Sequence, residues 1–473
     1  MNNQYKSKID SLLSGELFRK ASETAYREKV KLFIVGGYVR DIILEREKKE
    51  IDFLVVGDGI DFANKLAMEL GTEKVVVYRN FGTAQFHYRD LVLEFVGARK
   101  ESYRKESRKP EVEKGTFEED ISRRDFTVNT LALSLNRENY GELIDIYNGL
   151  EDLERGIIKT PLDPEITFED DPLRIMRGFR FASQLQFELD PATFEAAKIK
   201  AERLKIISQE RITDEFLKIM GSLRPSIGLH LMNFTGVSNF VFPELAALSG
   251  VDQRQDHHHK DVFLHTCIVV DNVASVSDNL WLRFAALVHD IAKPNTKRFV
   301  EGTGWTFHGH EELGAKMMKY IFDRMKLPLH HLDYIERLVR LHLRPIALVD
   351  DGVTDSAVRR LIVNAGDTLD DLFILCKADI TSKNQYKVSK YLSNYEKVVE
   401  KIKEVREKDE LRAFQSPVRG DEIMKICSIP PSKAVGEIKT EIEEAILDGR
   451  IGNNYEEALA YLFEIKDKFL QKT

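Results

Sequence analysis

The chain has 473 residues, 43% of them hydrophobic and 31% charged, which is typical of a globular protein with several hydrophobic cores. No apolar run reaches the roughly 20 residues that cross a bilayer, the N-terminus has no secretory hydrophobic stretch, and the three cysteines form no close-spaced metal-ligand pair, so we expect a cytoplasmic protein without membrane association. The net charge of −8 counts against a nucleic-acid partner and confines any RNA site to a local basic patch.

The segment from residue 32 to residue 96 alternates strand-like and helix-like stretches. Short apolar runs predict strands over Leu32–Val35, Ile51–Val56, Val75–Tyr78, Thr83–His87 and Leu91–Val96. Apolar residues at helical spacing predict helices over Tyr38–Glu45 and Asp61–Leu70. From about Asp170 onward the pattern is helical. The sequence therefore predicts an α/β head followed by a long all-α remainder.

Three polar or proline-containing stretches interrupt these patterns. Arg99–Glu119 is charged and poor in periodic apolar residues, which predicts a loop, and Lys159–Asp163 is a plausible hinge. The His-rich stretch Gln253–Lys260 opens the next unit. Within the first of these, Arg99–Lys109 carries six basic and two acidic residues, so it is the best local basic patch, although a solvated linker has the same composition.

Gly36-Gly37 closes one predicted strand and precedes a predicted helix, so backbone N–H groups and the helix dipole can face a phosphate there. Arg40 lies about one turn into that helix, on the side that a triphosphate would occupy. For the two glycines alone, a tight strand-to-helix turn is the simpler interpretation.

Two carboxylates follow on the next predicted strand. Glu50 and Asp52 are two residues apart, so both point to the same face of the sheet. Adjacent carboxylates repel each other unless cations lie between them, and two Mg²⁺ ions are what in-line phosphoryl transfer requires. Glu94 projects from the strand Leu91–Val96 and is a candidate third acidic group, with a solvated strand face as the alternative.

Four motifs follow one another over about 150 residues. They are Gly36-Gly37-Tyr38-Val39-Arg40-Asp41 with Glu50-Ile51-Asp52, then Arg123-Arg124-Asp125-Phe126-Thr127-Val128-Asn129, then Asp145 with Asn148-Gly149-Leu150-Glu151-Asp152-Leu153, and finally Asp170-Asp171-Pro172-Leu173-Arg174 continued by Arg177 and Arg180. In this order they resemble the motifs of the class II tRNA nucleotidyltransferase and bacterial poly(A) polymerase family.

The resemblance implies a polymerase-β-like head that uses Mg²⁺. It assigns Glu50 and Asp52 as metal ligands and implies triphosphate contacts from the turn at Gly36 and Gly37 and from Arg40 and Arg124. The chain departs from the family pattern at two positions. Glu50 replaces the usual Asp, and the fourth motif begins with Asp170 where Glu is usual. Both changes keep the charge, so we expect altered geometry and retained function.

The fourth motif offers a way to select a base without a template. At helical spacing Asp171 lies next to Arg174, which is also the pattern of a salt-bridged surface helix. A carboxylate acceptor beside a guanidinium donor matches the Watson–Crick edges of cytosine and adenine, whereas guanine and uracil place a carbonyl where an amino group is needed. The resemblance assigns base selection to these two residues, and Arg177 and Arg180 would then face the triphosphate.

A second set of potential ligands lies later in the chain, on separate predicted helices: His265, His289, Asp290, His310, His342 and Asp379. Histidines with aspartates suit a divalent cation, and the His-rich set favours Ni²⁺, Co²⁺ or Mn²⁺. A single His-Asp pair on an apolar helix would more often be a satisfied core pair. The order and local sequences resemble the HD phosphohydrolase superfamily, which implies metal-dependent phosphomonoesterase or cyclic-phosphodiesterase chemistry.

Together with the two resemblances, these observations predict four domains: a nucleotidyltransferase head (1–160), a helical neck for base selection and RNA binding (161–250), an HD domain (251–395) and a helical tail (396–473). A contact of the tail with tRNA is implied by the resemblance alone. The predicted activity is addition of CMP and AMP from CTP and ATP to the 3′ end of tRNA. In the family, a flexible loop at the place of Arg99–Lys109 helps switch specificity from C to A, and enzymes that add only CC lack it.

Other functions fit part of the same sequence. A poly(A) polymerase or A-adding enzyme would share the scaffold, but Phe81–Phe86 lacks the basic stretch of the poly(A) polymerase branch, and the chain has no long basic tail. An HD hydrolase with a degenerate head conflicts with the intact motifs, and a non-catalytic RNA-binding protein conflicts with the acidic charge. The sequence leaves the oligomeric state undetermined.

Overall fold

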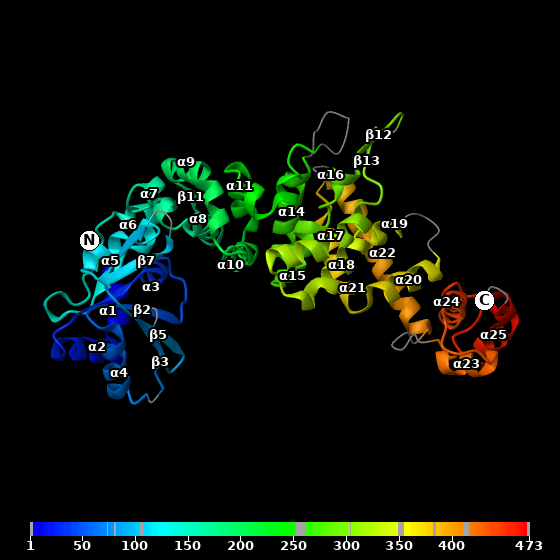
Figure 1. The fold of residues 1–473 in the computed structure, drawn as a ribbon, viewed down its shortest axis with the longest axis horizontal. Coiled ribbons are helices and arrows are strands. Elements are labelled where there is room, and N and C mark those ends of the chain that lie inside the picture. Colours follow the sequence, from blue (N-terminus) through cyan, green and yellow to red (C-terminus); the bar gives the residue numbers. More distant parts are fainter. Residues whose placement is uncertain are drawn as a thin grey trace. The chain divides into compact units, whose positions relative to one another are not determined.

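The computed structural model describes residues 3–72, 74–79, 82–104, 107–251, 261–302, 304–348, 354–381, 385–409 and 416–470 (Figure 1). The chain divides into two compact units, Met1–Ala246 and Ala247–Thr473. None of the helices in these ranges has the length and apolar character of a membrane span. The predicted α/β head followed by helical regions is confirmed.

The first unit contains a seven-stranded sheet with the strand order β3-β4-β5-β2-β1-β8-β9. Its strands are β1 (Lys31–Val35), β2 (Glu50–Val56), β3 (Val76–Tyr78), β4 (Thr83–Tyr88), β5 (Leu91–Gly97), β8 (Ala132–Ser134) and β9 (Leu143–Ile144). β2 and β5 are parallel, and the other neighbouring pairs are antiparallel. The five strands predicted from the sequence coincide with β1 to β5 within a few residues.

One face of this sheet carries the main core of the head, and the other face carries the cleft beside a smaller core in which Phe117 and Ile121 pack on the strands. The helices of the head are α1 (Asn3–Leu13), α2 (Glu16–Arg27), α3 (Gly37–Ile43), α4 (Gly59–Glu69), α5 (Phe117–Ser122) and α6 (Gly149–Arg155), with 3₁₀ turns η2 (Thr127–Asn129) and η3 (Arg137–Asn139). In β5 the side chains of Leu93 and Phe95 are buried in the head core, whereas Glu94 points to the opposite face. Phe53 and Phe95 stack in this core with ring centroids 4.8 Å apart.

The predicted loop Arg99–Glu119 is wrong in its secondary structure. Residues 99–104 (β6) and 107–114 (β7) form a separate antiparallel hairpin in which Arg99 pairs with Lys114. Thr116 and Glu119 then form a capping box at the start of α5. The backbone hydrogen bonds of a hairpin do not require an apolar sequence, so the charged composition was a poor indicator, and the Thr-x-x-Glu spacing was a readable helix start.

The neck of the first unit is helical: α7 (Pro164–Asp170), α8 (Leu173–Leu185), α9 (Pro191–Lys200), η4 (Ala201–Ile206), α10 (Gln209–Met220), α11 (Pro225–Phe234), α12 (Ser238–Val241) and α13 (Pro243–Ala246). Two short parallel strands, β10 (Ile157–Ile158) and β11 (Glu188–Leu189), join the end of the head to the segment after α8. α8 packs against both α10 and α11. The predicted hinge lies between β10 and α7.

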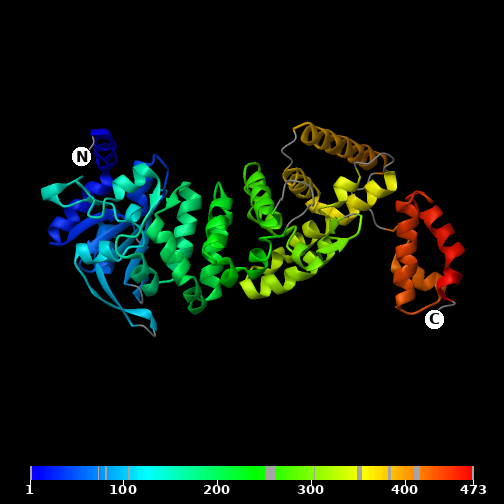
Figure 2. The same cartoon turned by 90° about the horizontal axis from the view of Figure 1, so that it is seen from above.

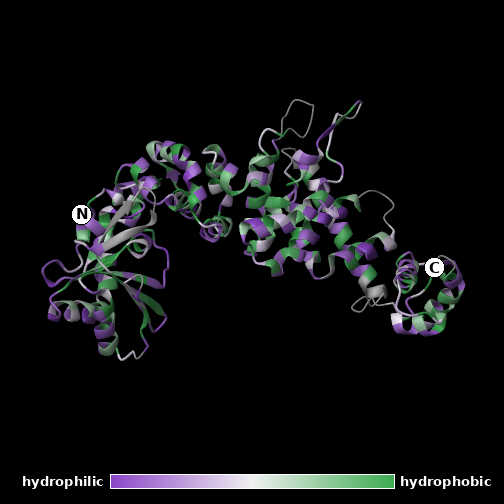
Figure 3. Ribbon diagram, in the orientation of Figure 1, coloured by the Kyte–Doolittle hydropathy of each residue, from purple (hydrophilic) through white to green (hydrophobic). Residues whose placement is uncertain are grey.

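The second unit is a helical assembly. Its elements are α14 (Val262–Ala274), α15 (Leu280–Val288), α16 (Lys293–Thr296), β12 (Arg298–Val300), β13 (Gly304–Thr306), α17 (His310–Met325), η5 (Leu329–His331), α18 (Leu332–Leu341), α19 (Arg344–Ala347), α20 (Asp355–Ala365), η6 (Gly366–Thr368), α21 (Leu369–Ala378) and α22 (Gln385–Asp409). Figure 3 shows apolar and polar residues on different sides of many of these helices, as amphipathic packing requires. The stretch Gln253–Lys260 lies outside the described residues.

Three helices end the chain: α23 (Gly420–Cys427), α24 (Lys433–Leu447) and α25 (Tyr455–Leu470). They lie together in Figure 2 and share a core of their own, in which Ile423, Ile438 and Leu462 are fully buried. Arg360 of α20 pairs with Glu444 of α24 at 2.9 Å. The predicted domain limits after residues 160, 250 and 395 stay predictions.

Candidate active site and metal centre

A cleft of about 1590 Å³ lies over β2 and β5 in the first unit. Pockets for single small molecules usually occupy roughly 300–1,000 Å³, so this cleft has room for a nucleotide and part of a second substrate. Every residue that the sequence predicted for the head site lines it: Gly36, Gly37, Arg40, Glu50, Asp52, Glu94, Arg124, Asp171, Arg174, Arg177 and Arg180.

The carboxylates occupy the sheet side of the cleft. Asp52 on β2 is directly paired with Glu94 on β5, so the two side chains project from neighbouring strands on the same face. Burial raises the pKa of Asp52, while Lys48 and Arg124 oppose that rise. Burial and the charge of Asp52 raise the pKa of Glu94. Burial and mutual repulsion oppose the ionised forms of these carboxylates, so a bound divalent cation would stabilise those forms. Carboxylate oxygens are hard ligands that suit such a cation.

The turn at Gly36 and Gly37 joins β1 to α3 at the edge of these carboxylates. Gly36 has φ of +74°, and a β-carbon there would lie 3.0 Å from Arg124 Nη1, so glycine is required. A β-carbon on Gly37 would lie 2.8 Å from Lys48 Nζ and 3.5 Å from Arg40 Nη2. The space above Gly37 is therefore bordered by two cations, which suits a phosphate group.

Asp120 is fully buried and holds two cleft arginines. Its Oδ1 accepts a hydrogen bond from Arg123 Nε at 3.1 Å, and its Oδ2 accepts one from Arg124 Nη2 at 3.1 Å. The main-chain N–H of Arg99 also donates to Oδ1 at 3.4 Å, and Arg123 Nε lies 3.3 Å from Arg99 O. One carboxylate thus fixes two guanidinium groups and the base of the β6–β7 hairpin.

Asp125 links the head to the first cleft-lining helix of the neck. Its Oδ2 accepts from Arg177 Nε at 2.8 Å, and its Oδ1 accepts from Asn129 Nδ2 at 2.9 Å. Burial would raise the pKa of Asp125, but Arg177 and Asn129 outweigh burial and hold it well below its usual range. Asn129 Oδ1 in turn accepts from Arg40 Nη1 at 2.7 Å. Arg40 is also bonded to Asp41, so its guanidinium is buried and oriented.

One face of α8 lines the cleft at helical spacing with Arg174, Arg177, Arg180 and Gln184, and the predicted shared face of Arg174 and Arg177 is confirmed. Phe181 lies beneath them, with the guanidinium carbons of Arg177 and Arg180 at 5.5 and 4.3 Å from its ring centroid. Arg180 Nε is 2.7 Å from Glu215 Oε2. These pairings position the arginines on the cleft wall, and their contact with a triphosphate stays a prediction.

Asp171 is not on the helix face that the sequence analysis assumed. It has an extended backbone two residues before α8, because the following Pro172 disfavours the helical conformation for it. Its Oδ1 accepts from the Leu173 N–H at 3.1 Å. Arg174 Nη2 donates to Arg123 O at 2.7 Å, which orients a group with five N–H donors. Both side chains still line the same cleft.

The residues of the third motif do not line the cleft; they fix α6 against η2. Asp145 Oδ1 and Oδ2 accept from the N–H groups of Gly149 and Leu150 at 2.7 and 2.9 Å, so it caps α6. A β-carbon on Gly149 would lie only 2.2 Å from Thr127 O, which shows how closely α6 approaches η2. Thr127 Oγ1 donates to Asp152 Oδ2 at 2.7 Å.

Sequence analysis missed the roles of the cleft residues Lys48, Arg123 and Arg211, and that of the buried Asp120, which lies behind two of the cleft arginines. Lys48 precedes Glu50 by two, which is the strand period. Asp120 precedes the two arginines by three and four residues, which is the helical period. For Arg211, on α10, the linear sequence carries no comparable signal.

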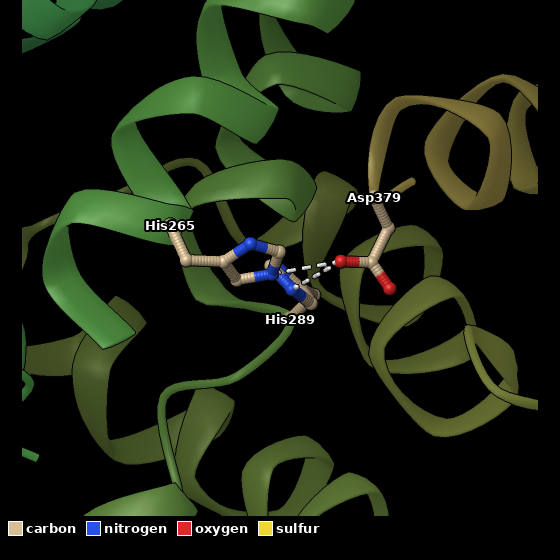
Figure 4. A group of neighbouring side chains, drawn as sticks. All are labelled: His265, His289 and Asp379. Atoms are coloured by element: carbon tan, nitrogen blue, oxygen red, sulfur yellow. Dashed lines mark ion pairs between the residues drawn. The ribbon is translucent and has the colours of Figure 1, made fainter. Parts of the chain in front are cut away.

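The six predicted metal ligands of the second unit converge. Two sets of three ligand atoms lie within 4.8 Å of one another, namely His265, His289 and Asp379, and Asp290, His310 and His342. No other such set occurs within the described ranges, so the carboxylates of the head are more widely spaced. Figure 4 shows the imidazoles of His265 and His289 directed at Asp379, with His265 Nε2 at 2.8 Å from Asp379 Oδ1.

Asp290 belongs to the second set and also contacts the first. Its Oδ2 is 3.1 Å from His289 Nε2, and its Oδ1 is 3.2 Å from His310 Nε2. The carboxylate therefore offers one oxygen to each set. Lys293 Nζ is 2.7 Å from Asp290 Oδ2 and places a further positive charge beside the cluster.

Hydrogen bonds on the outer nitrogens make the histidines suitable ligands. The Nδ1 atoms of His289, His310 and His342 lie 2.7, 2.8 and 2.6 Å from the carbonyl oxygens of Ala286, Phe307 and Val339. A carbonyl only accepts, so each Nδ1 donates, and in the neutral ring each Nε2 then presents a lone pair to the centre. This arrangement fits a divalent cation.

The charges of the cluster lead to the same conclusion. Burial lowers the pKa of His289, but Asp290 and Asp379 outweigh burial and raise it to about 10. Burial and the neighbouring His289 lower the pKa of His342 to about 4. The buried Asp290 and the partly buried Asp379 thus need positive charge among the histidines, which a bound cation would supply while leaving the rings neutral.

Comparison with known proteins identifies three matched regions. Residues 32–159 match the family model for the poly A polymerase head domain, residues 186–248 that for a probable RNA and SrmB-binding site of polymerase A, and residues 262–383 that for the HD domain.

Two relatives align over most of their length. An A-adding tRNA nucleotidyltransferase of Deinococcus radiodurans is 31% identical over 354 residues, which cover 72% of this chain and 77% of the relative. A CC-adding tRNA nucleotidyltransferase of Thermus thermophilus is 30% identical over 453 residues, which cover 91% and 92%. A crystal structure of a tRNA nucleotidyltransferase with a primer tRNA and an incoming ATP analog is 25% identical, covers 80% of this chain and 98% of that chain, and has a TM-score of 0.58.

Proposed function

The chain belongs to the tRNA nucleotidyltransferase family, and from this premise we propose that its first unit completes the 3′ CCA end of tRNA with CTP and ATP. The observation that carries the proposal is the convergence of all the predicted head residues on one cleft, with carboxylates from β2 and β5 and arginines from α3, α8 and the segment after α5. The reaction joins the 3′ oxygen of the RNA to the α-phosphorus of the nucleotide, and pyrophosphate leaves.

Each group in the cleft has a proposed part. Glu50 and Asp52, with Glu94 beside them, would hold Mg²⁺, which would neutralise phosphate oxygens and favour ionisation of the 3′ hydroxyl. The Gly36-Gly37 turn, Arg40, Arg124, Arg177 and Arg180 would orient the triphosphate. Asp171 would accept the amino proton of cytosine or adenine while Arg174 donates to the ring acceptors. A base with a carbonyl at that place would leave the carboxylate facing an acceptor.

Similarity alone does not determine which nucleotides the enzyme adds. The chain is nearly equally identical to an A-adding and to a CC-adding relative. The segment between the first two motifs, which the family uses to change from C to A, is present here as the β6–β7 hairpin. The proposal therefore includes the terminal A, with A-only addition and poly(A) synthesis as the alternatives.

The test uses three tRNA substrates that end at the discriminator base, one C later or two Cs later. Each is incubated with Mg²⁺ and single nucleotides, and product lengths are resolved on a gel. Complete CCA synthesis extends the first substrate by three residues when CTP and ATP are both present. Extension of only the last substrate by one A identifies an A-adding enzyme, and long A tails identify a poly(A) polymerase.

Two variants test the metal assignment in the same assay. Asp52→Ala should abolish nucleotide addition and leave tRNA binding largely intact, because the metals act on the triphosphate. Glu50→Asp, which restores the commoner ligand, should remain active. Near-normal turnover of Asp52→Ala would refute the assignment.

We propose a second, metal-dependent phosphohydrolase activity for the second unit. It is supported by the two ligand sets around Asp290 and by the donated Nδ1 hydrogens. The bound metal, which we expect to be Ni²⁺, Co²⁺ or Mn²⁺, would activate water toward a phosphate ester. A tRNA that ends in a 2′,3′-cyclic phosphate cannot be extended, so removal of that group would prepare the substrate of the first unit.

The combined variant His289→Ala and Asp290→Ala tests this activity. It should lose hydrolysis of 2′,3′-cyclic nucleotides and keep CCA addition in Mg²⁺. If the wild-type protein hydrolyses nothing with any of the three metals, the cluster is structural. If the variant is folded by circular dichroism but no longer adds nucleotides, the two activities are coupled.

We also infer a reducing compartment. Cys267, Cys376 and Cys427 are all free thiols, and the first two are buried. Cytoplasmic proteins keep their cysteines in this state.

A further inference from the structure

We propose that the β12–β13 hairpin of the second unit binds a single-stranded RNA end, with Trp305 as the surface on which a base stacks and Lys297 and Arg298 as phosphate contacts. The inference rests on the proposed phosphohydrolase function, and it names the substrate class as an RNA 3′ end in preference to a free nucleotide.

Both ends of the hairpin are attached to the ligand cluster. On the N-terminal side, α16 begins with Lys293, whose Nζ lies 2.7 Å from Asp290 Oδ2. On the C-terminal side, β13 leads into Phe307, whose carbonyl oxygen is 2.8 Å from His310 Nδ1. Lys293 Nζ also lies 5.6 Å from the centroid of the Phe307 ring. Both ends of the hairpin are therefore anchored at the proposed metal site, and Trp305 lies two residues before Phe307.

The hairpin exposes two aromatic side chains. Phe299 and Trp305 are directly paired across the strands, with ring centroids 5.3 Å apart at 75°. Phe299 is 53% exposed and Trp305 is 40% exposed. Figure 1 shows β12 and β13 projecting from the helices of the second unit. Large aromatic rings usually lose their water contact on folding, so an exposed pair on a projecting hairpin indicates a partner.

The charge beside these rings indicates a nucleic acid. Lys297 Nζ lies 4.6 Å from the Trp305 ring centroid, and Arg298 is exposed. Residues 293–308 contain three basic residues and one acidic residue, although the whole chain has a net charge of −8. A base can replace the ammonium on the indole face and free it for a phosphate. Aromatic stacking combined with nearby cations is the usual means of holding unpaired nucleotides.

The two tryptophans of the chain allow a direct binding test. In Trp281→Phe the only remaining indole is Trp305, and in the matched control Trp305→Phe it is Trp281. The probe is an eight-nucleotide single-stranded RNA that ends in a 2′,3′-cyclic phosphate. Stacking should quench the fluorescence of the first variant and leave that of the second unchanged. Equal fluorescence with and without the RNA in the first variant would overturn the proposal.

Hydrolysis kinetics provide a second measurement. Trp305→Ala should raise the KM for this RNA roughly 10-fold, the effect expected for one stacked base, with kcat and the KM for a 2′,3′-cyclic mononucleotide unchanged. Lys297→Ala should raise the same KM by a smaller factor. Equal effects on both substrates would overturn the proposal, because the hairpin would then act only through the metal site.

The outcomes separate this proposal from the one on which it rests. If the wild-type protein hydrolyses neither substrate, the phosphohydrolase function fails, and the Trp305 quenching still decides whether the hairpin binds RNA. If Trp305→Ala changes the molecular mass in light scattering and leaves RNA affinity unchanged, the hairpin is a contact between copies of the chain, and the proposal is wrong.

Discussion

Replacing Asp125 by Asn should destabilise the first unit by about 3 kcal/mol. Removing one partner of a buried ion pair costs roughly 3–5 kcal/mol. The lower limit applies because the Arg177 side chain retains 35% of its exposure and can be partly solvated after the change. Asn keeps the shape of Asp125 and its bond with the Phe126 N–H, so the effect reports the loss of the charged acceptor that faces Arg177.

Hydrogen exchange measured by mass spectrometry is the suitable assay, because the chain has two units and need not unfold in one step. Amides of α8 that exchange through unfolding of the first unit should lose roughly 100-fold in protection, which corresponds to about 3 kcal/mol. Peptides from α14 to α21 serve as the internal control and should be unaffected.

A double-mutant cycle with Arg177→Met tests the pairing itself. The two single changes should together cost more than the double variant, with a coupling energy of at least about 1 kcal/mol. Additive costs would refute the idea that Asp125 acts through Arg177, and so would a cost below about 1 kcal/mol for Asp125→Asn.

The same pair predicts a pH dependence. The pKa of folded Asp125 is depressed, so its stabilisation is present above the unfolded pKa of about 3.9 and is lost as the pH falls toward the folded value. Roughly 1 kcal/mol of the difference between wild type and Asp125→Asn should disappear by pH 3. A difference that stays constant from pH 7 to pH 3 would contradict this account.

Three further changes test other parts of the cleft. Replacing both Asp171 and Arg174 by Ala should raise incorporation of UTP or GTP relative to CTP and ATP while the overall rate falls, and unchanged nucleotide ratios would place base recognition elsewhere. Asp120→Asn should raise the KM for nucleotides roughly 10-fold in steady-state assays, because the two arginines it positions lose a charged acceptor, whereas an unchanged KM would make this buried carboxylate purely structural. Gly149→Ala should destabilise the first unit by about 3 kcal/mol or more in hydrogen exchange, because its β-carbon would lie 2.2 Å from a backbone oxygen. Gly436→Ala, in open space on α24, should be neutral or stabilising for that helix, and equal effects would contradict the packing argument.

Local periodicity predicted much of the site. The strand period placed Glu50 and Asp52 on one face, and the same alternation turned Glu94 away from the core side chains beside it. The helical period predicted that Arg174 and Arg177 share a face of α8. These are short-range relations, so a single sequence contains them.

Other features depend on contacts between distant segments. The base of the β6–β7 hairpin is fixed by Asp120, which lies 21 residues after Arg99 and follows a stretch that the composition alone marks as a loop. Asp171 was misplaced because the effect of Pro172 outweighs helical spacing. The metal centre joins ligands from His265 to Asp379, and no local period relates residues so far apart, so its prediction depended on the family resemblance.

The position of β1 has a consequence for synthesis of the chain on the ribosome. This strand pairs on one side with β2 and on the other with β8, which follows about 100 residues later. At the roughly 5–20 residues per second of translation, β1 presents an unpaired edge for about 5–20 seconds. An unpaired strand edge can pair with strands of other chains. We therefore expect the nascent chain to depend most on a chaperone while the head is being synthesised.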